Sequence, residues 1–198
     1  MEEAMRPAVD PYWYTILNAG PEPGHLSWLS QLKGFVNSIA DFGCWSDEPL
    51  VLMWTLDATE VVVVERDPAN LSRAKEDRDL LERTVPDALR GRSLRFIVAD
   101  MTEVLDEARL RSDHFDLAYC ERVLYHMSDP TQVQVAVSEM ARTVKPGGRV
   151  IAVESMPDQQ GNPRLGILAP LFEKAGLLEE NLDNAPEDAH CYRKPRSR

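Results

Sequence analysis

The sequence has no long run of apolar residues. A helix that crosses a membrane needs about 20 consecutive apolar residues, and no such stretch occurs in the 198 positions. Residues 1–7 carry neither the basic start nor the apolar segment of a secretory signal. We therefore expect a cytoplasmic protein with no membrane partner.

Cysteine is scarce as well. The three cysteines, Cys44, Cys120 and Cys191, are an odd number at wide spacing, which fits neither a disulfide framework nor a CxxC pair. No histidine or further cysteine accompanies them at the spacing of zinc ligands. We expect reduced thiols and no bound metal.

Positive charge is the scarcer sign. The chain has 22 Lys and Arg against 33 Asp and Glu, a formal net charge of −11. This charge opposes long-range attraction to a phosphate backbone or an anionic membrane. A nucleic-acid substrate is therefore disfavoured, and a small-molecule partner is expected.

The glycine pattern of a dinucleotide-binding turn is also absent. A nicotinamide dinucleotide is held through its pyrophosphate at a helix N-terminus, which requires G-x-G-x-x-G. Only Gly43 of that set is present, and Asp47 and Glu48 stand where the helix is expected to begin. Because their charge would repel a pyrophosphate, an NAD-linked oxidoreductase is disfavoured.

Short apolar runs alternate with amphipathic stretches through the middle of the chain. The apolar runs predict buried strands at residues 37–42, 61–65, 94–99, 115–120 and 149–154. The amphipathic stretches predict helices at residues 48–57, 68–81, 102–108 and 131–143. Ser46 is the expected N-cap of the first helix. Right-handed crossovers join such units into a doubly wound α/β sheet.

The two ends of the chain depart from this alternation. Residues 167–175 predict a helix that ends at Gly176, and residues 177–182 and 190–194 predict an antiparallel hairpin. We therefore expect a mostly parallel, seven-stranded sheet with helices on both faces, forming one compact domain over residues 35–198. Residues 1–34 are rich in aromatic and turn residues and predict an arm or lid, with a leading helix at residues 25–32.

The most specific pattern surrounds the first expected turn. Residues 39–47 read Ile-Ala-Asp-Phe-Gly-Cys-Trp-Ser-Asp, a strand that runs through an acid and a glycine into a helix start. This pattern resembles motif I of the class I S-adenosylmethionine (SAM)-dependent methyltransferases, a Rossmann-like family in which glycine lets the backbone approach the cofactor. The resemblance implies SAM as the cofactor, contacted by Asp41, Gly43, Cys44, Trp45 and Ser46. Trp45 and Asp47 replace two glycines that are usual in the family.

The next two strand ends resemble the same family. Glu65 ends the second expected strand and Arg66 follows it, where the resemblance implies contact with the ribose diol. Asp100 and Met101 follow the third, where it implies contact with the adenine ring. Other interpretations stay open, since Glu65 fits a solvated acid and Asp100 fits a helix N-cap.

The fourth and fifth strands complete the resemblance. Residues 114–126 are similar to motif IV of the family, which implies that Cys120 and Glu121 face the cofactor cleft. Residues 144–154 contain the Lys-Pro-Gly-Gly turn typical of the segment before strand five. Because strands one and four are neighbours in the family's sheet order, Cys44 and Cys120 are expected to lie close together.

Residues for the chemical step follow the fourth strand. Methyl transfer to a good nucleophile depends mainly on positioning and needs no obligatory base. If a base is needed, His126 is the first candidate and Tyr125 and Glu121 follow, although a histidine in this apolar setting also fits simple packing. A cluster of three aromatic residues is expected either to contact the acceptor or to anchor the arm: Tyr12, Trp13 and Tyr14.

Two functions from different classes remain. The first is a methyltransferase acting on an unidentified small molecule. The second is a non-catalytic SAM-binding module that works through a partner, which the altered glycine turn keeps open. An enzyme requires an open acceptor pocket beside the cofactor, whereas the second alternative predicts a filled one, with Trp45 as the residue to fill it.

Overall fold

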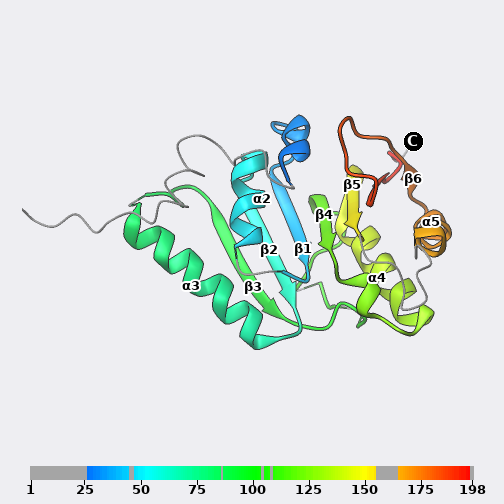
Figure 1. Cartoon of the computed structure of the whole chain (residues 1–198), viewed down its shortest axis with the longest axis horizontal. Coiled ribbons are helices and arrows are strands. Elements are labelled where there is room, and N and C mark those ends of the chain that lie inside the picture. The colour runs from blue at the N-terminus through cyan, green and yellow to red at the C-terminus, as the bar shows by residue number, and fades with distance from the viewer. Residues whose placement is uncertain are drawn as a thin grey trace, which may run out of the picture.

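A computed structural model describes residues 26–44, 47–85, 87–103, 105–107, 109–154 and 165–196. At its centre is a seven-stranded sheet with the order β3-β2-β1-β4-β5-β7-β6 (Figure 1). The strands are β1 (Ser38–Phe42), β2 (Glu60–Glu65), β3 (Ser93–Val98), β4 (Phe115–Glu121), β5 (Val144–Val153), β6 (Leu178–Glu179) and β7 (Ala189–Arg193). Strands β1 to β5 pair in parallel, and β7 is antiparallel to both β5 and β6. The predicted fold class is confirmed.

The helices in the described residues follow the expected alternation. They are η1 (Ser27–Leu32), α2 (Glu48–Leu56), α3 (Pro68–Thr84), η2 (Leu124–His126), α4 (Pro130–Thr143) and α5 (Leu165–Lys174), where η marks a 3₁₀ helix. Across the described part of the chain, none of these helices is both long and apolar enough to cross a bilayer.

Local sequence explains where α3 and α4 begin. Asp67 and Asp129 are their N-caps, each accepting a hydrogen bond from a backbone N–H two residues later, and each is followed by a proline at the first helical position. The expectation for α2 was wrong. Its N-cap is Asp47, which makes no side-chain capping bond, and Ser46 lies outside the described residues.

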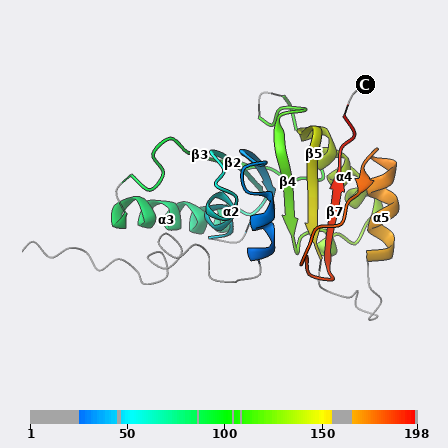
Figure 2. The same cartoon turned by 90° about the horizontal axis from the view of Figure 1, so that it is seen from above.

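The sheet separates two buried clusters. Neighbouring residues of a strand point to opposite faces, so Ile39 and Ala40 of β1 belong to different clusters. The cluster with Ile39 is covered by η1, α2 and α3, and the cluster with Ala40 by α4 and α5. In Figure 2, α2 and α3 lie beside the half of the sheet that ends in β3, and α4 and α5 lie beside the other half.

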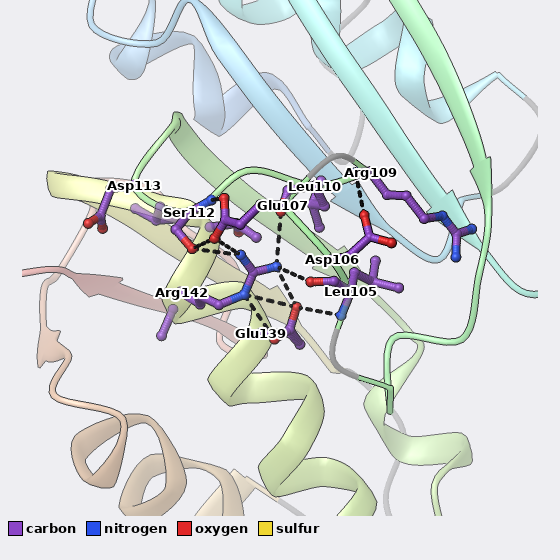
Figure 3. Close-up of polar contacts among 12 residues, drawn as sticks. Leu105, Asp106, Glu107, Arg109, Leu110, Ser112, Asp113, Glu139 and Arg142 are labelled. Atoms are coloured by element: carbon purple, nitrogen blue, oxygen red, sulfur yellow. Dashed lines mark hydrogen bonds and ion pairs between the residues drawn. The ribbon is translucent and has the colours of Figure 1, made fainter.

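The helix predicted at residues 102–108 is not formed, and its described residues adopt turns and coil. Arg142 of α4 donates to the carbonyls of Leu105 and Leu110 at 3.1 and 3.0 Å (Figure 3). The Leu105 N–H donates to the Glu139 carboxylate at 3.3 Å. Both backbone groups of Leu105 are therefore committed to α4 and cannot make helical bonds, so tertiary contacts override a short helical pattern.

Arg142 anchors a longer stretch of the same segment. Its guanidinium also donates to Glu107 at 3.1 Å and to the Ser112 hydroxyl at 2.7 Å, and it pairs with buried Glu139 at 2.8 Å (Figure 3). The hydrogen bonds and charge of Glu139 raise the pKa of Arg142 above its ordinary value. The segment between β3 and β4 is thus held by one arginine rather than by its own helix.

The C-terminal strands pair as predicted, but the first of them, β6, is shorter. Leu178 of β6 lies opposite Arg193 of β7, and β6 has only two residues. Gly176, with φ of +80°, ends the turn that follows α5. The remainder of the segment predicted at 177–182 belongs to the loop that leads back to β7.

Candidate functional site

The turn after β1 requires a glycine. Gly43 has φ of +82°, and its N–H donates to the Val64 carbonyl at 2.8 Å. A Cβ added at this position would lie 2.3 Å from Cγ2 of Val123, which is in the loop after β4. Only glycine lets these two loops approach so closely.

A cavity of about 270 Å³ opens at this turn, and we call it the first cavity. Its lining includes seven of the residues predicted to contact a cofactor: Gly43, Cys44, Glu65, Arg66, Asp100, Met101 and Glu121. Tyr125 and His126, the predicted bases, line the same cavity. The parallel strands thus bring residues that are distant in the sequence to one edge of the sheet. Which part of a cofactor each of them contacts stays a prediction.

The acids after β2 and β3 are oriented by their own loops. Glu65 is buried, and its Oε1 accepts a hydrogen bond from the Asp67 N–H at 2.7 Å. Asp100 Oδ1 accepts from the N–H and the hydroxyl of Thr102 at 2.9 and 2.8 Å, so it caps a turn. No described residue donates to the second oxygen of either acid. Each fixed carboxylate therefore has an oxygen with which to accept a ligand's hydrogen bond.

Asp41 is a buried acid that lacks a partner. Its exposed fraction is 0%, and neither carboxylate oxygen has a hydrogen-bond partner among the described residues. It is not a lining residue, but burial, followed by the charges of the lining residues Glu65 and Glu121, raises the pKa of Asp41 to about 8. An orphaned buried carboxylate is costly unless a donor or cation satisfies it.

Other buried acids strengthen this negative potential. Glu48 and Glu121 are both more than nine-tenths buried. The Tyr119 hydroxyl donates to Glu121 Oε2 at 2.6 Å, and burial together with the charge of Glu48 raises the pKa of Tyr119 well above its ordinary value. Arg122 Nε lies 3.7 Å from Glu121 Oε1. The lining of the first cavity has four acids, Glu65, Asp67, Asp100 and Glu121, against the two arginines Arg66 and Arg122, so the site favours a cationic ligand.

Glu154, which directly follows β5, is a site residue that the sequence analysis missed. Its carboxylate is buried and accepts from the backbone N–H groups of Leu124, Val123 and Tyr125 at 2.9, 3.2 and 3.2 Å. Burial raises the pKa of Glu154, and these three amides act in the opposite direction. Glu154 therefore holds the loop that presents Tyr125 and His126. The sequence signal that could have identified Glu154 is an acid at the end of a strand, the same signal that identified Glu65.

The two candidate bases lie together in that loop. The rings of Tyr125 and His126 have centroids 3.9 Å apart and are tilted by 36°. His126 is exposed, whereas Tyr125 is half-buried. The interpretation of His126 as a buried packing residue, which its apolar neighbours in the sequence allowed, is therefore wrong.

The structure differs from two expectations about cysteines. Cys120 does not line the first cavity; it is fully buried and its thiol lies 3.8 Å from Glu154 Oε1. Cys44 and Cys120 belong to different clusters on opposite faces of the sheet, because the chain turns between β1 and Cys44. All three cysteines are free thiols.

Five predicted site residues lie outside the described part of the chain. They are Tyr12, Trp13, Tyr14, Trp45 and Ser46.

A second cavity, of about 620 Å³, adjoins the first. It is lined by η1, by the ends of β4 and β5 and by the loop that leads into β7. Glu121 and Arg122 line both cavities. The two cavities therefore meet at the end of β4.

Residues 40–152 match the sequence model of a family described as methyltransferase domain. No curated protein matches the chain in sequence. The match covers β1 to β5 and therefore the strands and loops that form the first cavity.

Solved structures of similar fold include both methyltransferases and a cyclase. NodS, an N-methyltransferase from Bradyrhizobium japonicum WM9 solved with S-adenosyl-L-homocysteine, is 18% identical, with a TM-score of 0.59 over 87% of this chain and 86% of that chain. A TehB-like SAM-dependent methyltransferase from Corynebacterium glutamicum is 17% identical, with a TM-score of 0.61 over 92% and 94%. The [4+2]-cyclase SpnF is 16% identical, with a TM-score of 0.61 over 87% and 81%.

Proposed function

The chain belongs to the methyltransferase-domain family, and from this premise we propose that it transfers the methyl group of SAM to a small-molecule acceptor. A net charge of −11 supports a small molecule over a nucleic acid as the acceptor. The observation that carries the proposal is the junction of two cavities at Glu121 and Arg122. Methyl transfer requires donor and acceptor side by side, with reacting atoms about 3 Å apart.

The residues of the first cavity fit SAM. When bound, SAM supplies a methyl group on a cationic sulfonium. Gly43 lets a ligand approach the backbone, and Glu65 and Asp100 each keep an oxygen for hydroxyl and amino donors. Asp41, with no hydrogen-bond partner among the described residues, supplies negative charge to a cationic ligand in its ionised form, which a bound cation favours. We assign Glu65 to the ribose diol and Asp100 and Met101 to the adenine.

The loop after β4 serves the acceptor. His126 is exposed at the first cavity and its imidazole can take a proton from an acceptor near neutral pH. Tyr125 stacks against it and keeps the ring at the cavity. Glu154 acts through this loop as a positioning residue.

The alternative is a SAM-binding module without methyl transfer. Trp45 and Asp47 stand in place of two family glycines, and the similarity to the cyclase SpnF illustrates that this fold hosts other reactions. A filled acceptor pocket would support that alternative. The open second cavity supports the enzyme.

The test begins with calorimetric titration of the purified protein with SAM and with S-adenosyl-L-homocysteine, using NAD as the control ligand. Glu65→Ala should weaken SAM binding tenfold or more, since hydrogen bonds to a charged acceptor are worth about 1.5–3 kcal/mol each. Glu76→Ala, an exposed position on α3, removes the same charge away from the cavity and should leave binding unchanged. Absence of SAM binding would refute the proposal; binding without turnover on any acceptor would favour the non-catalytic alternative.

A further inference from the structure

The second cavity has walls that the fold holds in place. η1 contributes Trp28, and the loop before β7 contributes Asp183 and Asp188. The Gln31 side-chain amide donates to the Asp183 carbonyl at 2.7 Å and accepts from the Asp183 N–H at 3.1 Å. These two bonds join η1 to the loop, and Figure 1 shows the two segments as neighbours at the same end of the sheet. The cavity is therefore present before a ligand binds.

The lining of this cavity is rich in carboxylates. Glu121, Asp183 and Asp188 line it, with Arg122 as the basic residue. Arg122 Nε is 3.7 Å from Glu121 Oε1, so the lining has three acids for one guanidinium. The Glu121 carboxylate is 7% exposed, where water screens its charge least. The cavity favours a ligand that carries positive charge.

Trp28 places an aromatic ring in the wall of this cavity. It lines the cavity, and its exposed fraction is 8%. The face of an indole ring attracts a cation placed over it. The ring therefore favours the same positively charged ligand as the carboxylates do.

An organic cation fits this site better than a metal ion. Within the described residues, no three His, Cys, Asp or Glu side chains are placed to share a metal ion. At about 620 Å³, the cavity also has room for a small organic molecule.

We propose that the second cavity binds the methyl acceptor and that the acceptor is an amine. This inference rests on the proposed function. Glu121, shared by both cavities, binds the ammonium group at the junction, and the Trp28 ring lies in the wall of the second cavity. Asp183 and Asp188 add negative charge on the far wall.

For an amine in the second cavity, Glu121 and not His126 takes the proton, because Glu121 lines both cavities and His126 lines only the first. The ammonium gives one proton to the Glu121 carboxylate, which later passes it to solvent. The freed nitrogen lone pair forms a bond to the methyl carbon of SAM, the carbon–sulfur bond breaks, and its electron pair stays on sulfur. The products are the N-methylated ammonium, the neutral thioether and one proton.

Three ring-matched probes test the selection of charge. They are para-methoxyphenethylamine, the corresponding alcohol and the corresponding phenylacetate, each supplied with SAM to the full chain. Formation of S-adenosyl-L-homocysteine and the mass of the methylated product are measured. We expect turnover of the amine to exceed that of the alcohol and the carboxylate at least about tenfold.

Matched variants locate the effect. The double variant Asp183→Asn, Asp188→Asn should raise the KM for the amine about tenfold while SAM affinity stays unchanged. Glu187→Gln removes a charge from the same loop at a residue that does not line the cavity, and it should change neither value. SAM binding of each variant also reports that it is folded.

The outcomes separate this inference from the proposed function. If SAM does not bind, both fail. If SAM binds but the amine is turned over no faster than the alcohol or the carboxylate, the assignment of an amine acceptor is wrong and the proposed function stands. A KM unchanged in the double variant would also overturn the role of this wall.

Discussion

The two cavities that meet at Glu121 and Arg122 are built in different ways. The first cavity consists of residues at the ends of β1, β2 and β4 and just beyond β3, each in a short motif next to its strand. The second joins η1, two strand ends and the loop before β7; η1 and that loop are more than a hundred positions apart and meet through contacts such as that of Gln31 with Asp183. In this molecule, the part proposed to bind the common cofactor is made of short motifs that can each be recognised in the sequence, and the part proposed to select the acceptor is not.

Gly43→Ala should produce the largest loss of stability and of SAM binding. Gly43 lines only the first cavity. Alanine disfavours the positive φ of this position, and its Cβ would overlap the Val123 side chain. We therefore expect the free energy of unfolding to fall by about 3 kcal/mol and SAM binding to be abolished. Denaturant unfolding and calorimetry measure the two effects. Gly91→Ala is the control, since its φ of +75° is similar and nothing lies within 4 Å, and it should cost only about 1 kcal/mol. Equal losses in the two variants would mean that Val123 moves aside without cost.

Glu154→Ala should act on the junction between the cavities. Removing the carboxylate leaves three loop N–H groups without their acceptor, and an unsatisfied buried donor costs about 1–3 kcal/mol. We expect the unfolding free energy to fall by about 2–3 kcal/mol and acceptor turnover to fall more than SAM affinity. Glu154→Gln keeps one acceptor oxygen and should restore part of the unfolding free energy and part of the acceptor turnover. A purely structural role predicts that kcat is unchanged in the glutamine variant once the protein is folded.

Asp41 should make cofactor binding depend on pH. Its pKa of about 8 in the free protein lies above the unfolded value near 4, so the native state holds a proton that the unfolded state has lost between these limits. Stability contributed by this group is therefore greatest at low pH and declines as the pH rises toward 8. SAM, a cation, prefers the ionised carboxylate, so its affinity should rise about tenfold from pH 6 to 8 relative to Asp41→Asn. A ratio of the two affinities that does not change with pH would exclude this role for Asp41.

Trp28→Leu should give the smallest effect, limited to the second cavity. It keeps an apolar side chain and removes the aromatic face, whose attraction for a cation is worth about 0.5–2 kcal/mol, so the KM for the amine probe should rise about fivefold. SAM affinity, measured on the same preparation, should not change. If SAM affinity falls in parallel, the two cavities are not independent and the comparison between them fails.

Sequence patterns predicted the strands well because each buried strand is marked by its own apolar residues. The same reasoning placed Glu65 and Asp100 at strand ends, and parallel strands bring such ends together at one edge of a sheet. The patterns failed where a distant side chain decides the outcome. The prediction of a helix at residues 102–108 was wrong because Arg142 and Glu139, in α4, take the carbonyl and the N–H of Leu105 that such a helix would need.

The sequence by itself determined the order of the strands and of the helices other than the one expected at residues 102–108, the glycine after β1 and the acids at the ends of β2 and β3, because these depend on local periodicity and on backbone conformation. Only the tertiary structure decided that Glu154 holds the loop of Tyr125 and His126, that Asp41 has no hydrogen-bond partner among the described residues, and that Trp28 and Asp188 share a cavity. Such contacts arise between residues far apart in the chain. Burial and the resulting loss of solvent screening give them their effect, and neither is encoded in the residue types alone.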